Sequence, residues 1–128
     1  MFGEKGIYGQ SIIRVDDANR MILPKYTFAE PGDNLLILNE EEFLSIHSEN
    51  EIEEKIKRLE LELEEASSRN RKAKKKELYI LYSSILKKVT CDKQGRITLG
   101  DTTNSKEIKC IGAKDYLILE PQHKKTVR

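Results

Sequence analysis

This chain carries one short pattern twice, as VDDANRMILP at residues 15–24 and as CDKQGRITLG at residues 91–100. The aspartate, the arginine and a leucine match at a constant offset of 76 residues. Asn19 in the first copy aligns with Gly95 in the second, and these two residue types best tolerate positive φ. The repetition predicts a pseudo-two-fold body that presents the same surface twice.

Each copy predicts a tight turn between two short strands. A β-type run precedes each turn, at residues 12–15 and 88–91, and another run follows it. The aspartate opens the turn because its carboxylate accepts an N–H about two residues on. The fourth residue reverses the chain, and the arginine then starts the returning strand. Asp16, Asn19, Asp92 and Gly95 are therefore predicted to be the residues that shape the two turns.

Composition limits what the chain can be. A length of 128 residues predicts one compact unit or two very small ones. Hydrophobic residues make up 38% and charged residues 35%, which favours burial through duplication or oligomerisation over a large monomeric core. The net charge is only +1, so any affinity for nucleic acid has to come from local patches.

Several classes of site and location are not expected. Cys91 and Cys110 form no Cys-x-x-Cys pair and are predicted to be small apolar strand residues. We expect no metal, no cofactor and no small-molecule substrate. No stretch approaches the roughly 18 apolar residues of a membrane span, and the N-terminus lacks the apolar segment of a signal peptide. The expected location is the cytoplasm, in association with the nucleoid.

The chain divides into four parts by pattern. Residues 1–48 read as short strands, with a continuous apolar run at residues 35–38 that is typical of a strand buried on both faces. Residues 49–88 read as helical, residues 89–121 return to β, and residues 122–128 form a basic tail. Residues 43–47 are expected to pair with the apolar run. A second hairpin is expected from residues 108–111 and 116–119, with Pro121 ending the last strand.

Apolar spacings of three and four predict an amphipathic helix after Ser48, its expected N-cap, with Glu51 in the capping-box position. A break is expected at residues 67–70, followed by a second helix over residues 72–88. We expect an antiparallel helical hairpin; the alternative is one long kinked helix. The predicted buried positions are Ile52, Ile56, Leu59, Leu63, Ala66, Leu78, Leu81, Tyr82 and Ile85.

Charge is segregated within the helical part. Residues 40–65 hold eleven acids and three bases, whereas residues 69–76 hold six bases and no acids. One interpretation is mutual neutralisation of the two arms, with a solvated charged face. The other is a basic tip that contacts phosphate or an acidic partner.

Two interpretations also apply to Arg20 and Arg96. Each arginine can staple its turn by an ion pair with the aspartate four residues earlier, which is worth less than about 1 kcal/mol when exposed. Alternatively, the aspartate holds the guanidinium so that it points at a phosphate or a guanine edge. The two interpretations are compatible, because a DNA contact needs a positioned arginine.

The paired Asp-x-x-x-Arg patterns resemble those of the MraZ family, bacterial transcriptional regulators whose fold belongs with the AbrB-like swapped-hairpin barrels. The resemblance covers roughly residues 7–121 in order and spacing. It implies an α+β fold in which two AbrB-like β-hairpin halves form a pseudo-two-fold swapped-hairpin β-barrel, with the helical hairpin as connector. It also implies a homo-oligomer, a dimer or a ring, that binds short repeated sites on double-stranded DNA.

The resemblance assigns roles to particular residues. Arg20 and Arg96 would enter the groove of DNA, and Arg14, Lys25 and Lys93 would contact its backbone. Arg14 lies two residues before Asp16, where AbrB-type proteins often place a basic contact, but its counterpart in the second half is Thr90.

The chain departs from the family pattern at two places. Gly100 stands where a proline is expected, and neither copy has the short arginine-containing helix that usually follows. The corresponding segments are residues 25–29 and 101–105. Their composition removes expected phosphate contacts.

Two other functions are weighed against DNA binding. The first is a non-catalytic, oligomeric protein-interaction module that uses the helical connector. The second is an enzyme in which Asp16 and Asp92 form a carboxylate dyad, but neither is followed by the Thr/Ser-Gly that such dyads use. His47 and His123 are isolated, and the first is expected on a strand surface. We therefore expect no enzymatic activity.

Overall fold

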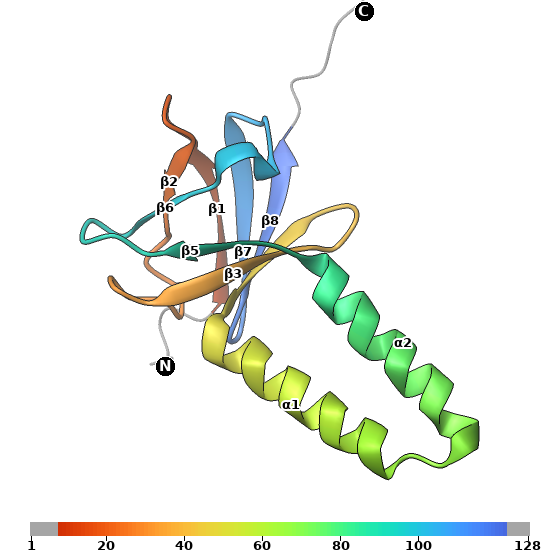
Figure 1. Ribbon diagram of the computed structural model, residues 1–128. Coiled ribbons are helices and arrows are strands. Elements are labelled where there is room, and N and C mark those ends of the chain that lie inside the picture. Colours follow the sequence, from red (N-terminus) through yellow and green to blue (C-terminus); the bar gives the residue numbers. More distant parts are fainter. Residues whose placement is uncertain (1–7, 123–128) are drawn as a thin grey trace, which may run out of the picture.

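The computed structural model describes residues 8–122 and shows strands in both outer parts of the chain with helices between them (Figure 1). The fold class is α+β, as predicted. The elements are β1 (Tyr8–Arg14), β2 (Arg20–Ile22), β3 (Asn34–Asn39), β4 (Leu44–Ser48), α1 (Glu49–Glu65), α2 (Ser68–Ser84), β5 (Ile85–Thr90), β6 (Arg96–Thr98), the 3-10 helix η1 (Gly100–Thr102), β7 (Glu107–Ala113) and β8 (Leu117–Gln122).

Six strands form an antiparallel sheet in the order β1-β7-β8-β4-β3-β5, and β2 pairs with β6 in a separate ribbon. The order mirrors the sequence duplication, because β1 corresponds to β5, β7 to β3 and β8 to β4. Strand β1 pairs with β7 from the other half of the chain, and β5 pairs with β3. The strands of the two halves are therefore interleaved.

The predicted closed barrel is not present among residues 8–122. Strands β1 and β5 are the two edges of the six-stranded sheet, and β2 and β6 pair only with each other. The chain turns sharply after β1 and after β5, and β2 and β6 then pair with each other rather than with either edge strand. The sheet is open, with the β2–β6 ribbon contacting both of its edge strands.

Strand β3 is buried on both faces, as its apolar run predicts. Leu35 and Ile37 belong to the main core, which also contains Met21 and Ile97 of the ribbon. Leu36 and Leu38 point the other way, into a second core that includes Ile52, Leu59, Leu78 and Leu81 of the helices. Because side chains alternate along a strand, one strand joins the two cores.

The helices form a hairpin that extends from one side of the sheet (Figure 1), so the alternative of one kinked helix is wrong. Ser67 caps α2 by accepting a hydrogen bond from the Asn70 N–H. Ser48 is the N-cap of α1, but its side chain makes no capping bond, so the predicted capping box does not form. No helix within residues 8–122 is long and apolar enough to cross a bilayer.

Three local predictions are wrong. The second helix runs over Ser68–Ser84 rather than residues 72–88: it starts directly after its cap Ser67, and it ends early because Ile85 to Thr90 pair with β3. Tyr82 is exposed rather than buried. Pro121 does not end the last strand; it lies within β8 beyond the three residues that pair with β4, where its missing N–H leaves no bond unmade.

Candidate nucleic-acid interface

The first turn is organised by the carboxylate of Asp16. Its Oδ1 accepts the backbone N–H groups of Ala18 and Arg20, both at 2.9 Å. Its Oδ2 accepts Nε of Arg20 at 2.9 Å. The backbone closes the same loop, since the Asn19 N–H donates to the Asp16 carbonyl. Both interpretations of the arginine therefore share one geometry, in which the aspartate staples the turn and fixes the guanidinium.

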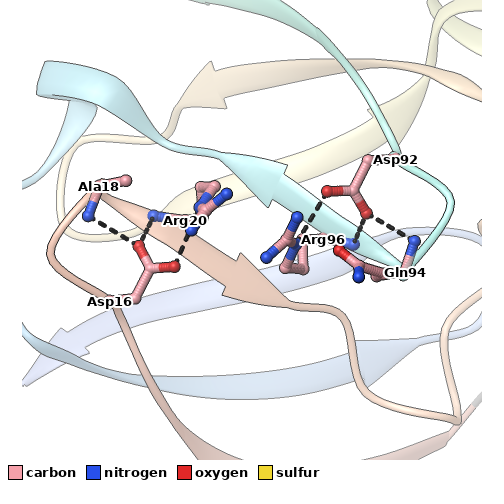
Figure 2. Close-up of polar contacts among 6 residues, drawn as sticks. All are labelled: Asp16, Ala18, Arg20, Asp92, Gln94 and Arg96. Atoms are coloured by element: carbon pink, nitrogen blue, oxygen red, sulfur yellow. Dashed lines mark hydrogen bonds and ion pairs between the residues drawn. The ribbon is translucent and has the colours of Figure 1, made fainter.

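The second turn repeats this arrangement. Oδ1 of Asp92 accepts the N–H groups of Gln94 at 2.9 Å and Arg96 at 2.8 Å. Oδ2 accepts Nε of Arg96 at 2.8 Å. Figure 2 shows the two aspartate–arginine pairs on neighbouring strands, with both arginines between the two aspartates. The predicted duplication of the surface is confirmed at this site.

The fourth residue of each turn has the left-handed backbone that the sequence predicts. Asn19 has φ of 58° and Gly95 has φ of 78°. A β-carbon added at Gly95 would meet no atom within 4 Å, so only the backbone angle restricts the residue type there.

We expect Gly95→Ala to lower the free energy of unfolding by about 1–2 kcal/mol, because an L-residue with a β-carbon is disfavoured at this φ. Gly95→Asn reproduces the residue found at position 19 and is the matched control, with a loss below about 1 kcal/mol. Urea denaturation measures both. Equal losses for the two variants would show that the backbone angle does not limit this position.

Hydrogen bonding lowers the pKa of both turn aspartates. The largest cause at Asp16 is the Arg20 N–H, and at Asp92 it is the Arg96 N–H. A folded-state pKa below the unfolded value means that the stabilisation is present above about pH 4 and is lost as the pH falls through the folded value.

We therefore expect Asp16→Asn combined with Asp92→Asn to flatten the fall in stability as the pH drops below about 4. Chemical denaturation across this range measures the effect. The matched control is Asp17→Asn with Asp101→Asn, because neither carboxylate pairs with an arginine in the described residues. The same steep decline in the Asp16/Asp92 variant as in the parent would contradict the assignment.

The ribbon register places the two arginines on one face. Arg20 lies opposite Thr98, Met21 opposite Ile97, and Ile22 opposite Arg96. Met21 and Ile97 are each 1% exposed and face the core. Because side chains alternate along a strand, the other four residues point away from it. Met21 and Ile97 also differ by the repeat offset of 76 residues, so the pseudo-two-fold axis passes between them.

Both guanidinium groups remain available for a ligand. The side chain of Arg20 is 37% exposed and that of Arg96 is 27% exposed. Only Nε of each is used by its aspartate, and within residues 8–122 the terminal nitrogens make no hydrogen bond. A planar pair of terminal nitrogens suits bidentate binding to a phosphate or a guanine edge.

The three predicted backbone contacts are all exposed but do not lie together. The Leu23 N–H donates to the Gly95 carbonyl, which places the segment that carries Lys25 beside the turn that carries Lys93. Arg14 ends β1 opposite Glu107 and precedes the other turn. The structure thus brings Lys25 and Lys93 to one end of the ribbon and leaves Arg14 at the other.

The backbone angle of Gly100 explains why a glycine stands where the MraZ pattern has a proline. Its φ is 61°, which the ring of a proline excludes. The Asn19 side chain donates to the Gly100 carbonyl at 3.1 Å, so this backbone joins the first turn to the segment after β6. Gly100 is also the first residue of the short helix η1, which carries no arginine.

A carboxylate dyad does not form. Each aspartate is bound to the arginine of its own turn, and the arginines stand between them (Figure 2). Residues 8–122 also contain no group of three or more histidine, cysteine, aspartate or glutamate side chains arranged to hold a metal. Cys91 and Cys110 are buried and unpaired, and burial raises the pKa of the Cys110 thiol to about 12.

The expected surface position of His47 is wrong, because this side chain lies in a polar cluster that no sequence motif indicates. His47 stacks on the Tyr116 ring with centroids 4.9 Å apart. Its Nε2 lies 3.0 Å from the hydroxyl of buried Ser45, which donates to Glu40 at 2.7 Å. Its Nδ1 faces Glu51 of α1 at 3.5 Å. This cluster connects the β3–β4 hairpin to the first helix.

Mutual neutralisation of the helical arms occurs only in part. Lys74 pairs with Glu62 at 2.9 Å, and Arg71 donates to the Leu63 carbonyl. In the described residues Arg69 forms no ion pair, and neither do the three other bases of the segment, which are Lys72, Lys75 and Lys76. Most of the basic segment is therefore open to solvent.

Comparisons with known proteins give no family assignment: no family model matches the chain, and no curated protein matches it.

Proposed function

We propose that this chain is a sequence-specific DNA-binding transcriptional regulator related to the MraZ family. The interleaved strands would be a divergent, open form of the AbrB-like swapped-hairpin barrel. The chain would act in the cytoplasm, associated with the nucleoid, as a homo-oligomer on repeated sites. Weak single contacts would add up through the linked copies.

The observation that carries this proposal is the outer face of the β2–β6 ribbon. The major groove of DNA is about 12 Å wide and admits a two-stranded ribbon. On this ribbon two arginines related by a pseudo-two-fold axis point outward with their terminal nitrogens open. Arginine bound to guanine is the commonest specific contact in that groove.

Selection of binding sites from random duplexes, followed by a salt titration, tests the proposal. We expect an enriched sequence repeated within each selected duplex. Log K should fall linearly with log salt, with a slope of about −0.9 per phosphate contact. Lys25→Ala with Lys93→Ala should reduce the size of that slope by about two such contacts. Failure to enrich any sequence would refute a sequence-specific function.

A protein-interaction role for the hairpin is supported by one surface. Tyr79 and Ile80 of α2 are 56% and 58% exposed, and Lys72, Lys75 and Lys76 lie beside them. Tyr79→Ser with Ile80→Ser tests this role without cutting the chain. Loss of self-association in light scattering with unchanged DNA binding per subunit would assign assembly to this face. Unchanged mass would remove the alternative.

A further inference from the structure

The outer face of the ribbon carries four side chains in a checkerboard. Arg20 and Arg96 occupy one diagonal, and Ile22 and Thr98 occupy the other. The arginines are identical across the pseudo-two-fold axis, whereas Ile22 corresponds to Thr98 by the repeat offset. The two copies are therefore identical at the arginine and differ at the residue on the other diagonal.

Each arginine lies directly across the ribbon from one residue of the second diagonal. The Leu23 N–H donates to the Gly95 carbonyl and the Leu99 N–H to the Asn19 carbonyl. In an antiparallel ladder the pairs between such hydrogen-bonded pairs have their side chains closest together. Arg96 therefore lies beside Ile22, and Arg20 lies beside Thr98, with β-carbons roughly 5 Å apart.

The two neighbours offer different chemistry to a base. Ile22 is 58% exposed and presents only methyl and methylene groups. In the major groove the 5-methyl group of thymine is the feature that favours an apolar contact. Thr98 is also exposed, and it carries one methyl group beside a hydroxyl that accepts or donates. It therefore offers a smaller apolar contact to a thymine than Ile22 does, and its hydroxyl tolerates several bases.

We propose that Ile22 is a specificity-determining residue that reads the methyl group of a thymine next to the base bound by Arg96, while Thr98 makes the other half of the contact permissive. This inference rests on the proposed DNA-binding function. It predicts that the ribbon recognises two non-identical halves, of which only one requires thymine.

Removal of single methyl groups from the DNA tests this proposal. A duplex obtained by selection with the full chain is resynthesised with deoxyuridine in place of one thymine at a time, at the same position of every repeat. At one position we expect deoxyuridine to weaken binding by the parent about fourfold for each repeat that is contacted. This is the loss of affinity expected when one buried methyl-sized group is removed. Ile22→Thr should lose most of the discrimination between the two duplexes, and Ile22→Val should keep most of it.

Thr98→Ile is the converse variant. With this variant, thymine at the mirror position should improve binding, and deoxyuridine there should remove the gain. Both substitutions change exposed side chains, so urea denaturation should show parent-like stability for each.

The outcomes separate the two proposals. If the parent forms no sequence-specific complex, the proposed function itself fails. Suppose instead that the parent forms a sequence-specific complex. If no deoxyuridine substitution weakens this complex, or if the substitution weakens binding of Ile22→Thr as much as binding of the parent, the role of Ile22 is refuted and DNA binding stands.

Discussion

Arg20→Ala combined with Arg96→Ala should lower the affinity for a selected DNA site by about 30-fold or more, because each bidentate contact to guanine is worth about 1–3 kcal/mol and two are lost. The two guanidinium groups share one face of the ribbon and point away from the core. Fluorescence anisotropy with a labelled duplex at fixed salt measures the loss. Each single variant should show a smaller loss, since one contact then remains.

The matched control removes the same two charges elsewhere. Arg58 and Arg69 are exposed residues of α1 and α2. Arg58→Ala with Arg69→Ala keeps the net charge of the test variant and leaves the ribbon untouched. An equal loss of affinity in this control would mean that the effect is general electrostatics. A double ribbon variant that binds like the parent would remove Arg20 and Arg96 from the interface.

Met21→Ala should lower the free energy of unfolding by about 2–5 kcal/mol, the usual cost of truncating a buried methionine. Met21 is 1% exposed and lies opposite Ile97 at the centre of the ribbon. Its removal leaves a cavity between the two halves of the chain. Because small domains are stable by only about 5–15 kcal/mol, a large part of the total is at stake.

Ile22→Ala is the matched control for this prediction. It truncates a similar side chain one residue further along the same strand, but Ile22 is 58% exposed. We expect a change within about 0.5 kcal/mol. Urea denaturation compares the two variants directly. Similar losses for Met21→Ala and Ile22→Ala would mean that the ribbon does not pack on the core as described.

The local geometry of the site was readable from the sequence. The aspartate that opens each turn, the positive φ at Asn19 and Gly95, and the position of each arginine all follow from interactions within five consecutive residues. The buried run at residues 35–38 was readable for a similar reason, because an apolar residue at every position requires two dry faces. Such short-range features depend little on where the rest of the chain goes.

Tertiary structure decided the features that join distant residues. The pairing of β2 with β6, which aligns Arg20 with Thr98 and Arg96 with Ile22, connects segments 76 residues apart, and neither turn specifies that register. The same is true of the end of α2 at Ser84 and of the partial burial of His47. The sheet stays open because β2 and β6 pair with each other rather than with β1 or β5, and the local pattern does not decide between these partners.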